Sequence, residues 1–88
     1  MLDSSNSQKF RDVIIQYRSK MSLTQQGLAI RMLRTNGIDY RDDLPLMEAT
    51  AQRIKMWERG QDPNIRDIVT LAKTINCTTD ELLRNYLL

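Results

Sequence analysis

The residues best suited to chemistry lie in one stretch, Thr50 to Asn64, whose pattern predicts a short helix followed by a stop. Thr50 is a favourable N-cap residue. Gly60 and Pro63 end the helix, because glycine accepts the left-handed conformation and proline prevents the helix from resuming. One side of this helix is apolar, and the opposite side carries Gln52, Lys55, Met56 and Arg59. Amide and cationic groups of this kind suit hydrogen bonds to base edges and phosphates.

The composition argues against enzymatic chemistry. The chain has 88 residues, enough for one domain, with no histidine and a single cysteine, Cys77. A histidine-activated nucleophile is therefore impossible, and a zinc site is not expected. The lone cysteine fits a reducing cytoplasm, and no apolar run or signal peptide suggests a membrane. We expect a cytoplasmic protein that is not an enzyme and has no cofactor, no metal and no membrane partner.

The charge is unevenly distributed along the chain. Residues 9–35 carry six basic side chains against one acidic, and residues 49–66 carry four against two. Residues 36–48, between them, carry one basic side chain against four acidic. Such a pattern is more often ordinary solvated helix surface than a nucleic-acid footprint. Charge alone therefore does not decide the function.

Two helices are expected before the acidic segment. The first spans about 8–20, with Ser7 as its cap, and the second begins after Thr24 and stops at residues 35–37, where Asn and Gly both accept the left-handed conformation. The apolar stripe of the first helix consists of Phe10, Val13, Ile14, Tyr17 and Met21.

Residues 36–48 leave two possible starts for the following helix. Asp42 or Asp43, with Pro45 in the first turn, is one start, and Thr50 is the other. The segment is too apolar for a floppy linker, so we expect it to be ordered.

The C-terminal part predicts two more helices. Asn64 caps the fourth, with Asp67 as a capping-box-like partner, and Asn76 ends it. A capping box at residues 78–81 then opens a fifth helix. Five helices without a strand or a repeat predict one all-α domain over residues 1–88, with an insertion at 36–48.

Taken in order, these motifs resemble the lambda-repressor-like helix-turn-helix family, also called the Cro/cI or XRE type. The similarity covers about residues 10–35 and 49–84. It rests on Arg18, Thr24-Gln25, Leu28-Ala29, Ile54, Trp57-Glu58-Arg59-Gly60, Pro63-Asn64, Leu71-Ala72-Lys73, Asn76-Cys77-Thr78 and Asp80-Glu81-Leu82-Leu83. The family joins its second and third helices by a tight turn, whereas this chain has about fifteen extra residues between Ala29 and Gly60.

The resemblance implies roles in DNA binding for individual residues. Thr24 and Gln25 match positions that grip a phosphate and brace the recognition helix. Thr50 matches the cap of that helix. The base-reading positions correspond to Ala51, Gln52 and Met56. Candidates for contact with the phosphate backbone are Arg53, Lys55, Arg59, Gln61, Asn64 and Arg66.

Other matched positions are structural. Arg18 and Glu58 match a pair that family members usually bridge, so a partly buried ion pair is expected between them. Trp57 and Cys77 are expected in the core, with stacking on DNA the less favoured role for Trp57.

The function that follows is a sequence-specific DNA-binding transcriptional regulator, a small repressor of the phage, plasmid or mobile-element kind. It would bind a double-stranded operator as a homodimer. The apolar C-terminal residues either form the dimer surface or close the monomer core: Leu82, Leu83, Tyr86, Leu87 and Leu88. The alternative is an antitoxin, anti-repressor or other interaction module that uses the same fold, with residues 36–48 as its partner surface.

Overall fold

The computed structural model describes the backbone of residues 4–75 and the side chains of residues 10–75. It contains α1 (Ser4–Met21), α2 (Gln25–Thr35), a short 3-10 helix η1 (Tyr40–Asp42), α3 (Leu44–Glu58) and α4 (Ile65–Thr74). No strand occurs in this range, so the all-α prediction is confirmed. The predicted fifth helix, the Asn76 stop, Cys77 and the proposed dimer surface (Leu82, Leu83, Tyr86, Leu87 and Leu88) lie outside the described residues.

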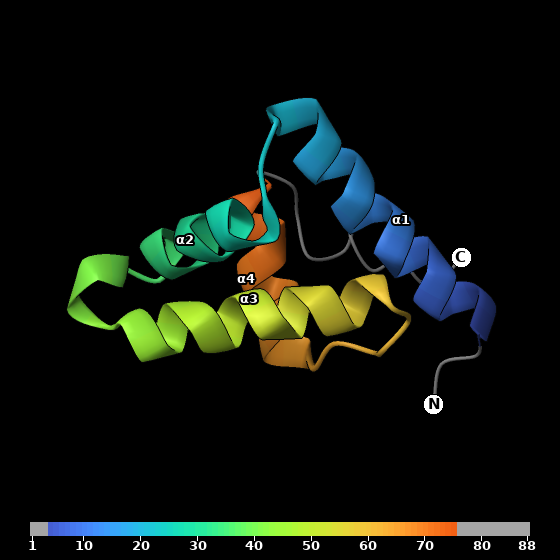
Figure 1. Ribbon diagram of the computed structural model, residues 1–88. Coiled ribbons are helices and arrows are strands. Elements are labelled where there is room, and N and C mark those ends of the chain that lie inside the picture. The colour runs from blue at the N-terminus through green and yellow to red at the C-terminus, as the bar shows by residue number, and fades with distance from the viewer. Residues whose placement is uncertain (1–3, 76–88) are drawn as a thin grey trace.

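Helix α3 is the central element of the arrangement (Figure 1). It packs against α1 and against α2, and α2 also packs against α4. The chain reverses direction between α2 and α3 through residues 36–43, which include η1. The orientation of α3 therefore depends on contacts with two other helices.

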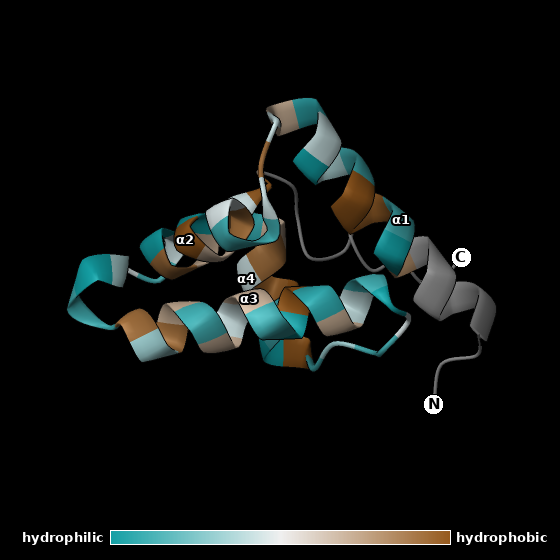
Figure 2. Ribbon diagram, viewed as in Figure 1, coloured by the Kyte–Doolittle hydropathy of each residue, from teal (hydrophilic) through white to brown (hydrophobic). Residues whose placement is uncertain are grey.

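The core takes side chains from all four helices. Its buried members are Phe10, Ile14, Leu28, Ala29, Met32, Ile54, Trp57, Ile68, Leu71 and Ala72. The rings of Phe10 and Trp57 meet edge to face, with centroids 5.9 Å apart and planes at 76°. The predicted core position of Trp57 is confirmed, since only 3% of it is exposed. Figure 2 shows apolar and polar residues interspersed along α2 and α3, as expected for amphipathic helices.

Met21 is an exception to the predicted core stripe of the first helix. It is 39% exposed, because it is the last residue of α1 and lies beyond the part of that helix that meets the core. The predicted start of the helix was also wrong. The helix begins at Ser4, so Ser7 lies inside it and is not its cap. Serine and asparagine are poorer helix formers than alanine by less than about 1 kcal/mol, so helical backbone continues through them.

Helix α3 begins at the earlier of its two predicted starts. The Asp43 side chain accepts a hydrogen bond from the Leu46 amide at 3.1 Å, and Pro45 occupies the first turn. The prediction of Thr50 as the cap was wrong. Its hydroxyl donates to the Leu46 carbonyl at 2.8 Å inside the helix, and its side chain is 2% exposed. A threonine bonded to the carbonyl one turn back is tolerated within a helix, so the helix has no need to start there.

Three helices end in the same hydrogen-bonded motif, in which the residue after the cap takes a left-handed conformation. After α2 this residue is Gly37 (φ 78°), and after α3 it is Gly60 (φ 102°), as the sequence predicted. After α1 it is Ser22 (φ 55°), the one non-glycine residue with a positive φ in the described chain. The Leu23 amide donates to the Arg18 carbonyl at 2.8 Å and closes the motif.

Ser22→Gly should therefore stabilise the protein. A side chain in the left-handed region costs about 1–2 kcal/mol, and the extra unfolded-state freedom of glycine offsets part of that gain, so the free energy of unfolding should rise by about 0.5–1 kcal/mol. Urea unfolding followed by far-UV circular dichroism measures the change. Ser19→Gly, at an exposed helical position of α1, is the matched control and should lower stability by about 0.5 kcal/mol. Equal effects of the two substitutions would contradict the left-handed assignment.

Candidate nucleic-acid interface

An ion pair between α1 and the end of α3 sets the position of the candidate interface. The Arg18 guanidinium donates from Nε to Glu58 Oε2 and from Nη2 to Glu58 Oε1, both at 2.7 Å. Its Nη1 also donates to the Leu23 carbonyl at 3.0 Å. The hydrogen bond to Glu58 raises the pKa of Arg18 above its ordinary value. The pair predicted from the sequence is present, and it is largely shielded from solvent, with 21% and 10% of the two side chains exposed.

The beginning of α2 joins the same network. The Gln25 amide donates from Nε2 to Glu58 Oε1 at 3.1 Å, so one carboxylate connects α1, α2 and α3. The exposed Thr24 caps α2, since its hydroxyl accepts from the Gly27 amide at 2.9 Å. Gln25 therefore braces α3 in this structure, and its side chain is engaged within the protein.

The side of α3 that faces away from the core is the candidate interface. We call it the outer face of α3, and it consists of Glu48, Gln52, Lys55, Met56 and Arg59, with Ala51 at its edge, where Ala51 also packs against the core. Glu48, Gln52 and Arg59 are exposed, and the other three are partly buried. On the opposite side of the helix Met47, Ile54 and Trp57 are buried. The helix is therefore held by its apolar side while its polar side meets solvent.

The two cations of the outer face have no partner within the described residues. The ion pairs within residues 10–75 join Arg11 with Asp12, Arg18 with Glu58, Arg41 with Asp39, and Arg53 with Asp67. Neither Lys55 nor Arg59 takes part in any of them. Because no carboxylate of the described chain neutralises these two groups, their charges are available to an external anion.

Part of the outer face forms a shallow hollow with the beginning of α2. The hollow has a volume of about 290 Å³ and is lined by Gln25, Gln26, Met47, Glu48, Ala51, Gln52 and Lys55. It brings Gln25 next to three of the sequence-predicted residues of α3. The set of DNA-binding residues predicted from the sequence contains neither Gln26 nor Glu48, and Glu48 joins this surface only with the earlier helix start. The sequence feature that could have identified Glu48 is the helix start at Asp43 with Pro45 in the first turn, because this start places Glu48 one turn before Gln52 on the same helix.

Four other sequence-predicted residues lie between α2, α3 and α4, away from the outer face of α3. Thr50 is buried, which removes it from any contact with DNA. The Arg53 guanidinium faces α4 and pairs with Asp67 at 3.3 Å. The side chain of Asn64 accepts from the Asp67 amide at 2.8 Å and caps α4, as predicted. These residues and the exposed Arg66 line a second hollow of about 330 Å³ between α2, α3 and α4.

Gln61 is exposed in the loop between α3 and α4. Together with Arg66 it flanks α3 and does not lie on the outer face. Of the sequence-predicted residues, the hollow beside α2 collects Gln25, Ala51, Gln52 and Lys55, while the hollow beside α4 collects Thr50, Arg53, Asn64 and Arg66. The predicted set therefore does not form one continuous site.

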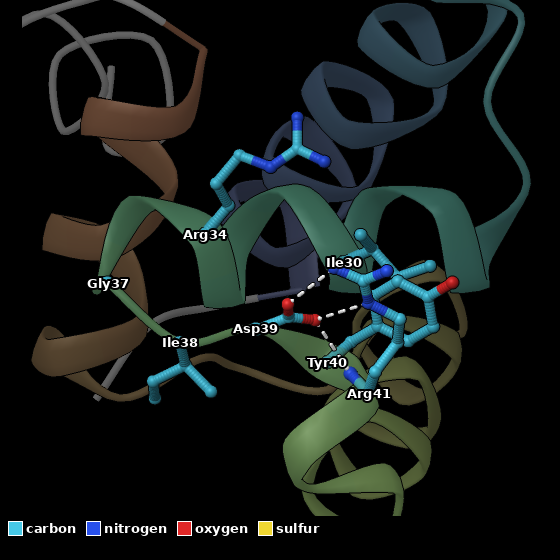
Figure 3. A pocket seen from close by; sticks show the side chains of 7 residues that line it. All are labelled: Ile30, Arg34, Gly37, Ile38, Asp39, Tyr40 and Arg41. Atoms are coloured by element: carbon cyan, nitrogen blue, oxygen red, sulfur yellow. Dashed lines mark hydrogen bonds and ion pairs between the residues drawn. The ribbon is translucent and has the colours of Figure 1, made fainter.

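The insertion forms a third hollow, shown in Figure 3. Its volume is about 590 Å³, and it is lined by Ile30, Arg34, Gly37, Ile38, Asp39, Tyr40 and Arg41. The Asp39 carboxylate accepts from Arg41 Nε at 3.1 Å and from Nη2 at 2.7 Å. The hydrogen bonds from Arg41 lower the pKa of Asp39 to about 2, so the carboxylate stays ionised until the pH falls toward that value. The Arg34 side chain extends away from this pair in Figure 3, and its charge makes only a smaller contribution to the lowered pKa of Asp39.

Comparisons with protein-family profiles, characterised proteins and solved structures find no match to this chain. No helix in residues 4–75 combines the length and apolar character that crossing a bilayer requires. Among the same residues, no cluster of three or more Cys, Asp or Glu side chains is placed to hold a metal ion. The geometry of α3 and its surroundings is therefore the basis on which a function can be proposed.

Glu58→Gln should strongly destabilise the protein. The substitution leaves the Arg18 guanidinium without a counter-charge in a largely shielded position, and a cost of about 3 kcal/mol is expected, at the low end of the range for buried pairs. Chemical denaturation of Glu58→Gln, of Arg18→Met and of the double variant measures the loss and the coupling between the two sites.

The control for this pair is Arg41→Ala. Its ion pair with Asp39 is exposed, with 74% and 40% of the side chains accessible, so its removal should leave the unfolding midpoint unchanged. A midpoint for Glu58→Gln that matches the wild type would show that the pair does not hold α1 against α3.

Proposed function

We propose that the protein binds duplex DNA sequence-specifically through the outer face of α3 and acts as a transcriptional regulator. One observation carries this proposal. A helix fixed by the core on one side presents, on the other, an amide and two cations that no described residue engages. A helix surface that only contacts solvent does not need to be held in one position, whereas a surface that recognises DNA bases needs a rigid support.

The chemistry of each residue suits a position in the major groove. The exposed Gln52 amide matches adenine, which offers N6 as donor and N7 as acceptor. Ala51 and Met56 offer apolar contact to thymine methyl groups. Lys55 and Arg59 would neutralise phosphates and so set the register of the helix on the duplex. Outside the outer face, Thr24, Gln61 and Arg66 are exposed and remain candidates for backbone contacts.

The length of α3 limits how it can enter the groove. Its 15 residues span about 22 Å at about 1.5 Å per residue. The major groove is about 12 Å wide, so a helix of this length fits along the groove and not straight across it. A single helix reads few base pairs, and we propose that a homodimer occupies two half-sites about 34 Å apart.

A second candidate function is a protein-interaction module, for example an antitoxin or anti-repressor. The observation that favours it is the hollow at the insertion, where Ile30, Ile38 and Tyr40 offer apolar surface to a partner. A partner there would leave the outer face of α3 uncovered. This function is therefore compatible with DNA binding by the same chain.

Selection of binding sites from random duplexes, followed by fluorescence anisotropy at several salt concentrations, tests the DNA-binding proposal. Affinity should fall steeply with salt. Lys55→Ala and Arg59→Ala should each reduce the salt slope, which is the slope of the logarithm of the binding constant against the logarithm of the salt concentration, by about 1. Gln52→Ala should abolish the preference for adenine at one position, a loss of about 1–3 kcal/mol of discrimination.

Gln16→Ala is the matched control, because Gln16 is an exposed glutamine on α1 away from the proposed interface. It should leave affinity, salt slope and base preference as they are in the wild type. Equal affinity of the wild type for selected and random duplexes at physiological salt would overturn the proposal and leave the interaction module as the function to test.

A further inference from the structure

We infer that Glu48 is a specificity-determining residue of α3 that reads a cytosine in the major groove. This inference rests on the proposed DNA-binding function, and it concerns a residue that lies in the insertion and has no counterpart in the motifs of the helix-turn-helix resemblance. It arises from where α3 begins.

The early start of α3 places Glu48 on the outer face. Because Asp43 caps the helix, residues 44–49 add about a turn and a half before Thr50. Glu48 is exposed, lies one turn before Gln52, and lines the same hollow as Gln52 and Lys55. Had the helix begun at Thr50, Glu48 would belong to the connection and not to this face.

The Glu48 carboxylate has no partner within residues 10–75. Other carboxylates of this part of the chain have defined roles: Glu58 and Asp67 form ion pairs between helices, Asp39 pairs with Arg41, and Asp43 caps α3. One turn from Glu48 on its own helix lie Leu44 and Gln52, neither of which carries a charge. The carboxylate is therefore exposed and free to accept hydrogen bonds.

A free carboxylate on a DNA-reading helix has one favourable target. Phosphates repel it, while the N4 amino group of cytosine donates a hydrogen bond into the major groove, where glutamate is the matching acceptor. Four residues of helix rise about 6 Å, and base pairs are spaced about 3.4 Å apart, so Glu48 and Gln52 would reach positions about two base pairs apart. The recognised half-site should then contain a cytosine and an adenine at that separation.

Another role for Glu48 makes a different prediction. A carboxylate near the beginning of a helix is stabilised by the helix dipole. If Glu48 only stabilised the start of α3, its substitution would lower the melting temperature and leave the base preference of the protein unchanged. Base preference therefore separates the two roles, and stability is measured alongside it.

The experiment is binding-site selection with the full chain, comparing wild type, Glu48→Ala and Glu48→Gln, with thermal unfolding of each. Wild type should prefer cytosine at one position by about tenfold to a hundredfold. Glu48→Ala should reduce that preference to less than about threefold while the adenine preference at the Gln52 position persists. Glu48→Gln should shift the preferred base at the Glu48 position from cytosine to adenine.

Asp42→Asn is the control for charge. Asp42 is exposed in η1, so this variant also removes one negative charge, but away from the outer face. It should strengthen binding to all sequences alike and leave the cytosine preference intact. An unchanged motif in both Glu48 variants would overturn the inference while leaving the proposed function in place. A wild type without any base preference would overturn both.

Discussion

The bidentate contact between Arg18 and Glu58 is the interaction on which the arrangement of the helices depends. It joins residues 40 positions apart in the chain, and both hydrogen bonds measure 2.7 Å. Because Gln25 donates to the same carboxylate, the end of α3 is tied to α1 and to the beginning of α2 at one point. The core then fixes the rotation of α3 about its own axis, since Trp57 is buried against Phe10. Position and rotation together determine which side chains α3 presents to solvent.

The cations around α3 differ in whether the fold engages them. Arg18 and Arg53 both bridge α3 to another helix, on opposite sides of it. Lys55 and Arg59 bridge nothing within the described residues. The spacing of basic residues along the chain does not reveal this division, because it depends on which neighbour each side chain meets. A positive helix is therefore a weaker indication of a binding surface than a positive side chain that the fold leaves without a partner.

Much of the fold was predictable because helix ends are encoded locally. The caps at Thr24 and Asn64 and the left-handed glycines at Gly37 and Gly60 were all predicted from residue type and spacing. The start of α3 was ambiguous, because Asp43 and Thr50 are both good caps; in the structure Asp43 caps the helix by accepting from the Leu46 amide, and Thr50 lies buried inside it. The candidate site was predicted less well. Whether Arg53 meets DNA or Asp67 depends on how α4 packs, which local sequence does not specify.

The exposed ion pair between Arg41 and Asp39 affects how the salt dependence of the proposed DNA binding would be interpreted. Arg41 and Asp39 hold each other near the surface, where mobile ions weaken such contacts. They lie in the short connection that leads into the Asp43 cap and hence into the first turn of α3. If α3 binds DNA as proposed, added salt would compete for the phosphates and loosen the first turn of α3 at the same time. Because this exposed pair contributes little to global stability, the loosening would be confined to the first turn of α3, and the number of ions released on binding would exceed the number of phosphates contacted only by that local effect.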